Sequence, residues 1–284
     1  MKKILLTGAT GFIGSEILKN LSQKYKIFII IRKKKIEKKL LNKNTKILSY
    51  KKFRELNKKL LKLRVDYVIH CATHYVKNHS FEDLEKLNKS NILFGNVILE
   101  NLKKMKVKKF INFSTVWENY NNEKENFFNL YSVYKKIFGN LIDFYKKREN
   151  KTQFYTLMIS DTFGEFDKRK KIINTLRNNY KKNKITSIVS RNLFLNLLNV
   201  KDITKAVDLI LKNKITPDIY VLKNKKEYSI LKIIQNFNKK NPKKIKIKWI
   251  SNKILREKIY NYKHLNGWIP TESKIKDIVD LIKK

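Results

Sequence analysis

The sequence predicts an α/β fold in which a doubly wound parallel sheet is joined to a smaller C-terminal α/β lobe. Apolar runs alternate with helical patterns from the N-terminus, and each run is almost continuously apolar, which is typical of parallel strands buried on both faces. In addition, a glycine-rich turn joins the first apolar run to the first helical pattern, as in doubly wound sheets that bind dinucleotides.

Strands and helices alternate regularly in the first part of the chain. Short, nearly unbroken apolar runs predict strands, and longer segments with apolar residues three or four apart predict helices. The expected strands lie at 3–8, 26–32, 65–72, 108–115 and 153–160, and the expected helices at 14–24, 55–63, 83–106 and 129–148.

The alternation loosens after residue 160. Helices are expected at 170–182, 202–213, 229–240 and 272–284, and strands at 192–200, 218–224 and 244–250, of which 218–224 continues the main sheet. We therefore expect a dinucleotide-binding Rossmann domain with the catalytic residues at 1–160. Residues 161–284 would form mainly a substrate-binding lobe, with some segments returning to the sheet.

The composition predicts a cytoplasmic protein without a membrane span. Of the 284 residues, 42% are hydrophobic, and no apolar run approaches the roughly 18 to 20 residues of a membrane helix. The single cysteine, Cys71, allows no intrachain disulfide and fits a reducing compartment. With four His and one Cys, we expect no metal site.

The formal net charge of +42 is extreme and raises the question of a nucleic-acid or anionic-membrane partner. The basic residues are nearly all Lys, with eight Arg, and they are scattered along the whole chain. Base readout and bidentate phosphate contacts favour Arg. A chain rich in Lys, Ile and Asn is instead typical of AT-rich genomes, so we expect neither partner.

Gly8, Gly11 and Gly14 follow the first strand and open the first helix, the context that a phosphate-binding fingerprint requires. The first glycine permits the tight turn, the second lets the backbone approach a pyrophosphate, and the third lets helix and strand pack closely. The alternative is a purely structural turn. Because the chain has only seven glycines, three in one loop favour a dinucleotide.

The end of the second expected strand indicates which dinucleotide is bound. A carboxylate there would bind the ribose hydroxyls of NAD, whereas Arg accommodates the additional phosphate of NADP. The sequence has Arg32, Lys33 and Lys34 and no acidic residue, which favours NADP(H) and leaves NAD(H) possible.

Tyr131 and Lys135 are one helical turn apart and share a face of an expected helix. An ammonium beside a phenol lowers the pKa of the phenol, so Tyr131 could exchange a proton with a substrate oxygen near neutral pH. Ser114 and Thr115 end the preceding strand, at the edge where such sheets bind ligands. Asn91 is a polar residue within the preceding long helix, either a supporting residue of the site or a solvated one.

The segments TGATGFIG, FST, SNILFGN and YSVYK resemble the extended short-chain dehydrogenase/reductase family, the branch of NAD(P)-dependent nucleotide-sugar epimerases, dehydratases and reductases. NLLNVKDITKAV and NGWIPTESKIKDIVDLI are similar to later segments of that family. The resemblance implies a homodimer formed through two long helices. It also implies a catalytic set of Thr115, Tyr131 and Lys135, with Asn91 as the supporting residue.

The resemblance implies two binding sets as well. Cofactor contacts are expected from Gly8, Thr10, Gly11, Phe12, Ile13, Gly14, Arg32 and Ala72, together with Tyr131 and Lys135. Substrate contacts are expected from Ser114, Trp117, Asp161, Lys168 and Arg169, with Lys171 as a further anion contact.

A narrower resemblance concerns the group of CDP-abequose and CDP-paratose synthases. It rests on FSTVWENYNNEKENFFNLYSVYK and DTFGEFDKRKKIINTL. It implies NADPH-dependent reduction of the 4-keto group of a nucleotide-activated deoxyhexose, CDP-linked, for bacterial surface polysaccharide. The alternatives are an NAD-dependent nucleotide-sugar 4-epimerase and a cofactor-binding relative without catalysis. The acidic residue that often meets the adenine in this family is absent from ILSYKKF.

Overall fold

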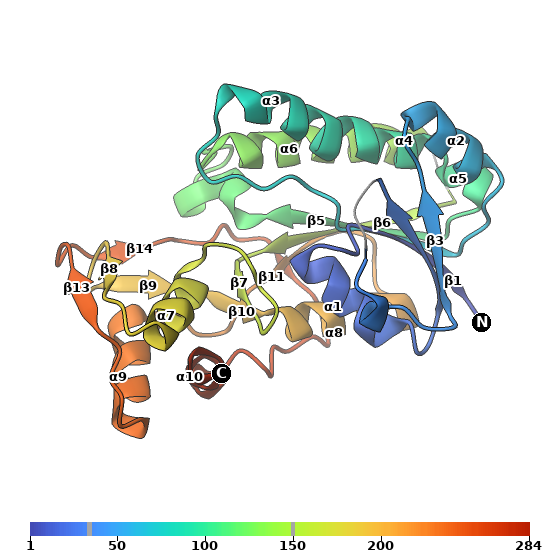
Figure 1. The fold of residues 1–284 in the computed structure, drawn as a ribbon. Helices are drawn as coiled ribbons and strands as arrows, with labels where there is room; N and C mark the ends of the chain where they lie inside the picture. Colours follow the sequence, from blue (N-terminus) through green and yellow to red (C-terminus); the bar gives the residue numbers. More distant parts are fainter. Residues whose placement is uncertain (33–35, 149–150) are drawn as a thin grey trace.

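The computed structural model describes residues 1–32, 36–148 and 151–284, and its main feature is an eight-stranded sheet between two helical layers (Figure 1). Its strands run in the order β15-β11-β6-β5-β4-β1-β2-β3, and every neighbouring pair is parallel. The strands are β1 Lys3–Thr7, β2 Lys26–Ile31, β3 Thr45–Ser49, β4 Tyr67–His70, β5 Lys109–Thr115, β6 Gln153–Ile159, β11 Ile219–Leu222 and β15 Lys263–His264. This arrangement confirms the predicted doubly wound sheet.

Alternate side chains of the central strands enter two separate cores. Leu6 and Ile69 point to one face, which α1 (Phe12–Leu21) and α8 (Val200–Lys212) cover. Leu5 and Val68 point to the opposite face. The helical segments of that layer are α2 Phe53–Leu61, α3 Phe81–Leu87, η2 Asn88–Leu93, α4 Phe94–Glu100, α5 Leu102–Met105 and α6 Leu130–Arg148. Burial on both faces is the reason these strands carry unbroken apolar runs.

The smaller lobe lies at one end of the sheet (Figure 1). Its elements are β7 Asp161–Phe163, α7 Ile172–Lys181, β8 Thr186–Ile188, β9 Leu193–Leu195, β10 Leu197–Asn199, β12 Tyr228–Ser229, α9 Ile230–Lys240, β13 Ile247–Trp249, β14 Leu255–Arg256 and α10 Ile275–Lys283. Two short 3₁₀ segments, η1 Lys38–Leu40 and η3 Val116–Asn122, complete the described elements. A third core, built around Phe163 and Phe237, holds the lobe together.

Two predicted elements are wrong in detail. The single strand expected at 192–200 is divided into β9 and β10, which belong to different sheets. The side chain of Asn196, between them, bonds the backbone of Asn224 in both directions, with distances of 2.8 and 3.0 Å, and so turns the chain there. The continuous helix expected at 83–106 contains a π-helical segment, η2, and ends in a separate short turn, α5.

Asp202 connects the two late segments that the sequence singled out. Its carboxylate is fully buried and accepts bonds from the backbone N–H groups of Thr271 and Glu272 and from the hydroxyl of Ser273. The indole of Trp268 donates to the Asp202 carbonyl at 2.8 Å. These bonds attach the segment before α10 to the start of α8.

Candidate functional site

The glycine loop lies where the strand order reverses, between β1 and its neighbours β2 and β4. Gly8 has a positive φ of 69°, and a Cβ there would lie 2.7 Å from the backbone N of Ala72. A Cβ on Gly14 would lie 2.2 Å from the Gly8 carbonyl oxygen. These two positions therefore require glycine for the turn and for the close approach of α1 to β1.

Gly11 differs, because an added Cβ would meet only the Gly8 carbonyl oxygen, at 3.2 Å. The fold therefore requires glycine less strictly at position 11 than at positions 8 and 14. It is the N-cap of α1, where it supplies no capping side chain, and no acidic residue occupies the first turn. A helix N-terminus bounded by bare backbone fits a dinucleotide pyrophosphate, because its N–H groups and dipole favour an anion.

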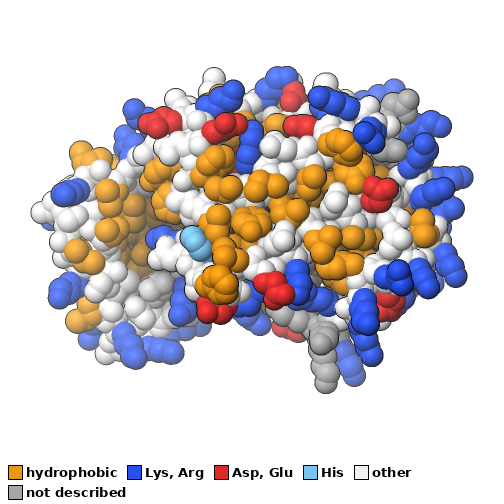
Figure 2. Space-filling view, turned by 90° about the horizontal axis from the view of Figure 1, so that it is seen from above, with side chains coloured by type: hydrophobic (Ala, Val, Ile, Leu, Met, Phe, Trp, Pro, Cys, Tyr) orange, Lys and Arg blue, Asp and Glu red, His pale blue; other side chains and the backbone are white. Residues whose placement is uncertain are grey.

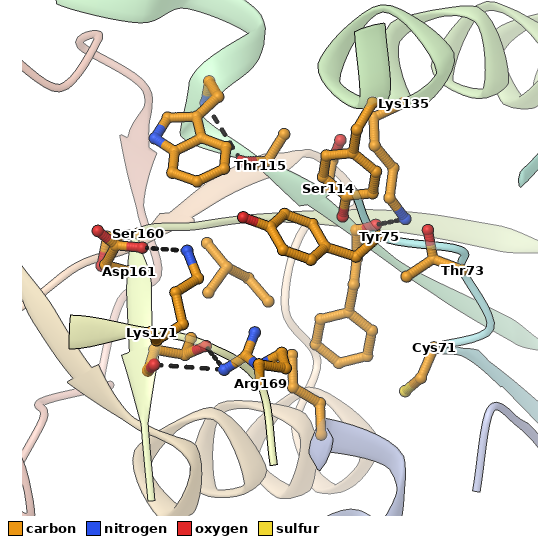
Figure 3. A pocket seen from close by; sticks show the side chains of 16 residues that line it. Cys71, Thr73, Tyr75, Ser114, Thr115, Lys135, Ser160, Asp161, Arg169 and Lys171 are labelled. Atoms are coloured by element: carbon orange, nitrogen blue, oxygen red, sulfur yellow. Dashed lines mark hydrogen bonds and ion pairs between the residues drawn. The ribbon is translucent and has the colours of Figure 1, made fainter. Parts of the chain in front are cut away.

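A pocket opens beside this loop, at the carboxyl ends of the parallel strands (Figure 3). It is lined by Ile13, Cys71, Thr73, Tyr75, Phe113, Ser114, Thr115, Trp117, Tyr131, Lys135, Ile159, Ser160, Asp161, Thr162, Arg169 and Lys171. Asp161 and Lys171 form one side, and Cys71 and Thr73 form the other. The pocket thus brings together residues from β5, the loop after β4, α6 and the start of the smaller lobe.

Tyr131 and Lys135 enter the pocket from α6. Lys135 is 4% exposed and donates to the Phe113 carbonyl at 2.8 Å, while its Nζ lies 5.8 Å from the centre of the Tyr131 ring. Burial lowers the pKa of Lys135 to about 8. Burial also raises the pKa of Tyr131 above its ordinary value, although a hydrogen bond with Thr73 acts in the opposite direction.

The expectation that Lys135 lowers the pKa of Tyr131 is therefore wrong for this structure. The loss of hydration of the phenolate dominates and outweighs the hydrogen bond with Thr73 and the charge of Arg169, which both lower the pKa. Tyr75 packs edge-on against the Tyr131 ring, with centroids 5.1 Å apart, and adds to the enclosure. The consequence is a phenol that stays protonated at neutral pH.

Asn91 acts on the pocket through the loop after β4. It lies in the π-helical segment η2 and is 3% exposed. Its side chain accepts from the backbone N–H of His74 at 2.6 Å and from the Thr73 hydroxyl at 3.2 Å, and it donates to the His74 carbonyl at 3.0 Å. It thereby holds Thr73, which forms a hydrogen bond with Tyr131.

Glu118 is a buried carboxyl group beneath the pocket floor. It is 9% exposed and accepts a hydrogen bond from the hydroxyl of Ser114, which lines the pocket. Burial raises the pKa of Glu118 to about 7, and the charge of Lys135 opposes this rise. Glu118 lies in the segment FSTVWENYNNEKENFFNLYSVYK, on which the narrower resemblance rests. Its burial could not be predicted from the residue type alone.

Replacing Glu118 with Gln should increase stability at alkaline pH. The raised pKa means that the folded protein holds this proton more tightly than the unfolded chain, so wild-type stability falls as pH rises from about 4.5 through about 7. The variant lacks this penalty, which is on the order of 3 kcal/mol.

Chemical denaturation of both proteins at about pH 5 and about pH 8 measures the effect. The advantage of the variant should appear mainly at the higher pH, and Glu123→Gln, at an exposed carboxylate of the same segment, should show no such difference. An equal effect at both pH values would mean that Glu118 does not titrate in this range.

Three charged residues enter the pocket from the smaller lobe. Arg169 bonds Asp167 at 2.7 and 2.8 Å, and its guanidinium lies 4.6 Å from the centre of the Phe12 ring, next to the glycine loop. Lys171 pairs with Asp161 at 2.7 Å, and its Nζ lies 4.5 Å from a ring centre of Trp117. Although burial alone lowers the pKa of Lys171, Asp161 raises it above the ordinary value.

Two predicted contacts lie away from the pocket. The Lys168 side chain is 89% exposed and lies 3.7 Å from Glu37, so its position argues against a substrate contact. Arg32 is exposed beyond the end of β2, and Lys33 and Lys34 lie outside the described residues. Thr10 is exposed on the glycine loop, and Ala72 donates its N–H to the Thr7 hydroxyl at 3.1 Å below that loop.

Sequence reasoning missed Thr73, Tyr75, Ser160 and Thr162 as pocket residues. A signal was present, because each follows the carboxyl end of β4 or β6, where parallel sheets place their ligands. Within the described residues, no group of three or more His, Cys, Asp or Glu side chains could hold a metal ion. Across the same part of the chain, no helix combines the length and apolar character needed to cross a bilayer.

Comparison with known proteins identifies the family of this chain. The sequence profile of the NAD dependent epimerase/dehydratase family matches residues 4–222, which contain the glycine loop, Thr115, Tyr131 and Lys135. The chain belongs to this family. Membership confirms the resemblance to extended short-chain dehydrogenases/reductases, and it makes the chain an enzyme of the oxidoreductase/epimerase type.

Relatives of this epimerase/dehydratase family member include a CDP-abequose synthase of Yersinia pseudotuberculosis, 26% identical over 206 residues that cover 72% of this chain and 71% of the relative. A UDP-glucuronic acid 4-epimerase of Bacillus cereus, solved with UDP-glucuronic acid and NAD, has a TM-score of 0.80 at 22% identity and covers 99% of both chains. A UDP-N-acetylglucosamine 4-epimerase of Methanobrevibacter ruminantium has a TM-score of 0.82 at 19% identity, with 99% and 97% covered. The two structures share the fold of this chain.

Proposed function

We propose that this enzyme reduces the 4-keto group of a nucleotide-activated deoxyhexose, with CDP-linked sugars as its preferred substrates. The observation that carries the proposal is the placement of Tyr131, Lys135 and Thr115 in one pocket beside the glycine loop. The CDP-abequose synthase relatives, which cover more than two thirds of the chain, support the CDP-linked sugar.

The pocket residues have complementary roles in this reduction. A nicotinamide dinucleotide on the glycine loop would supply the hydride to C4 of the sugar. Tyr131, held protonated by burial, donates its phenolic proton to the carbonyl oxygen as negative charge develops there. Thr115 donates a hydrogen bond to the same oxygen, and Lys135 adds positive charge from beneath.

Tyr131 has a role in either candidate reaction: it would donate a proton in a reduction, and it would first remove a proton from the sugar hydroxyl in an epimerisation. The 4-epimerases of the same fold, solved with NAD, make epimerisation the second candidate function.

Arg32 supports NADPH as the cofactor. It follows β2, where a carboxylate would bind the ribose hydroxyls of NAD, and the chain has no acidic residue at 32–35. NAD(H), with which the Bacillus cereus epimerase was solved, is the alternative.

The test is to follow NADPH absorbance in the near ultraviolet with a panel of 4-keto nucleotide sugars, CDP-linked ones first. Stoichiometric loss of NADPH with one sugar is the expected result, and NADH should be consumed more slowly. Tightly bound NAD in the purified protein, without consumption of NADPH, would support the epimerase instead. If neither signal is observed, both the reductase and the epimerase are overturned.

We further propose that residues 161–284 form mainly the substrate-binding lobe and that the reaction serves surface-polysaccharide synthesis in the cytoplasm. The pocket supports the first point, because its walls are shared between residues of the main sheet and the β7–α7 region. The polysaccharide role is supported by the named synthase relatives. The single cysteine is compatible with the reducing compartment in which the proposal places the enzyme.

We also propose that the enzyme is a homodimer formed through α3, α4 and α6. Figure 2 shows apolar side chains gathered on the face that these helices present, with Lys and Arg toward the edges. Phe81, Leu93, Ile137 and Phe144 are between 41% and 83% exposed there. A contiguous apolar face with a charged rim is typical of a protein interface.

Light scattering after size-exclusion chromatography should therefore give the mass of a dimer for the wild type and of a monomer for the double variant Ile137→Asp and Phe144→Asp. Ile250, 66% exposed just beyond β13, provides the control, because Ile250→Asp should leave the dimer intact. A monomeric wild type would refute this interface.

A further inference from the structure

A second, smaller hollow adjoins the pocket at the junction of β6, β7 and β9. It is lined by Val116, Ser160, Asp161, Phe194, Leu195, Asn196, Glu257 and Ile259. Ser160 and Asp161 also line the main pocket, so the two spaces share a wall. The smaller space, called the acidic hollow below, is therefore within reach of a ligand that fills the main pocket.

Two buried oxygen atoms at the acidic hollow have no hydrogen-bond partner among the described residues: Ser160 Oγ and Glu257 Oε1. The second carboxylate oxygen of Glu257 accepts from the indole N–H of Trp117 at 3.2 Å, which fixes the orientation of the group. Buried polar atoms in folded proteins nearly always have a partner, and an unpaired carboxylate oxygen is especially unfavourable. Both atoms accept hydrogen bonds, so a donor on a ligand would satisfy them.

The charges around the hollow point to the same kind of ligand. Although the chain carries a net charge of +42, two carboxyl groups, Asp161 and Glu257, meet here. The nearby cations already have partners: Lys171 pairs with Asp161 at 2.7 Å, and Arg256 pairs with Glu227 at 3.1 Å. Burial, reinforced by the charge of Asp161, raises the pKa of Glu257 to about 7. In its charged form Glu257 disfavours a phosphate or carboxylate and favours a hydroxyl or ammonium group.

We propose that the acidic hollow is a subsite for a hydrogen-bond-donating substituent of the sugar, a hydroxyl or amino group, with Glu257 and Ser160 as its specificity-determining contacts. This inference rests on the proposed function, because it assumes that a nucleotide sugar fills the main pocket. The subsite would make the enzyme select sugars that carry a hydroxyl or amino group at the carbon whose substituent reaches the acidic hollow.

The experiment compares the binding of CDP-glucose and of CDP by titration calorimetry, with UDP-glucose and UDP as a second matched pair. Glu257→Gln should weaken binding of the sugar nucleotide by about tenfold, the size of one hydrogen bond to a charged group. Ser160→Ala should weaken it by about fivefold, the size of one hydrogen bond between neutral groups. Neither should change the affinity for the nucleoside diphosphate, which has no sugar to reach the hollow. Glu272→Gln, a carboxylate that lines neither space, is the matched control and should change nothing. Thermal melting of each variant checks its fold.

Equal losses for the sugar nucleotide and the diphosphate, or no loss for either, would overturn the subsite while leaving the reductase intact. If the folded wild type binds neither sugar nucleotide, the subsite is overturned, and the proposed function fails with it only if no 4-keto nucleotide sugar causes loss of NADPH. Consumption of NADPH, measured separately, distinguishes the two failures.

Discussion

Replacing Tyr131 with Phe is expected to lower turnover by about a thousandfold, because proton transfer by a positioned side chain contributes roughly 10² to 10⁴ to the rate. Phe keeps the ring that packs edge-on against Tyr75 but removes the hydroxyl that faces Thr73. Stopped-flow or steady-state loss of NADPH with the substrate found in the panel measures the effect. Cofactor affinity should be preserved.

Tyr134→Phe provides the matched control, since Tyr134 lies on the same helix but does not line the pocket. It should retain wild-type turnover. If Tyr131→Phe kept most of its activity, another group would have to supply the proton, and the assignment of the pocket would be wrong. If it lost cofactor binding as well, the loss of turnover would no longer report on the chemistry.

Replacing Gly14 with Ala is expected to abolish dinucleotide binding and to destabilise the fold. The new Cβ would lie 2.2 Å from the Gly8 carbonyl oxygen, a backbone atom that cannot move without displacing the loop. Overpacking of this kind costs about 1–3 kcal/mol in stability. Because the displaced loop is the one proposed to bind the dinucleotide, binding should be lost even where the protein remains folded.

Fluorescence titration with NADPH and thermal melting measure the two effects separately. Gly139→Ala is the control, because a Cβ on this residue of α6 meets nothing within 4 Å and Ala favours a helix. It should bind NADPH normally and melt no earlier than the wild type. Normal binding by Gly14→Ala would show that the loop has room to adjust and that the close approach is not required.

The two variants test different parts of the same site. Gly14 and Tyr131 were both identified from short sequence patterns, a glycine spacing after a strand and a Tyr–Lys pair one helical turn apart. Such patterns can be read locally because turn conformation and helical periodicity depend on neighbours within a few residues. The position of the glycine loop beside the pocket that holds Tyr131 also followed from the sequence, since the carboxyl ends of parallel strands share one edge of the sheet.

The sequence alone predicted less about the second half of the chain. It assigned one strand to 192–200, but the bonds between Asn196 and Asn224, 28 residues apart, divide that segment between two small sheets. It also assigned one continuous helix to 83–106, where η2 takes the π-helical form around Asn91. Both segments contain a polar side chain, Asn196 or Asn91, that bonds backbone groups far along the chain, and residue propensities do not register such bonds.

By itself, then, the sequence determined the doubly wound sheet, the glycine loop and the Tyr131–Lys135 pair. Strand burial, turn geometry and helical spacing can all be recognised from residues that are close together in the sequence. The tertiary structure alone decided the electrostatics of the pocket. It buried Glu118 beneath Ser114, enclosed Tyr131 so that its pKa rises, and brought Glu257 to Trp117 across 140 residues of chain. Burial and contacts between remote segments set the protonation and hydrogen bonding of these groups, and neither quantity can be read from residue type or spacing.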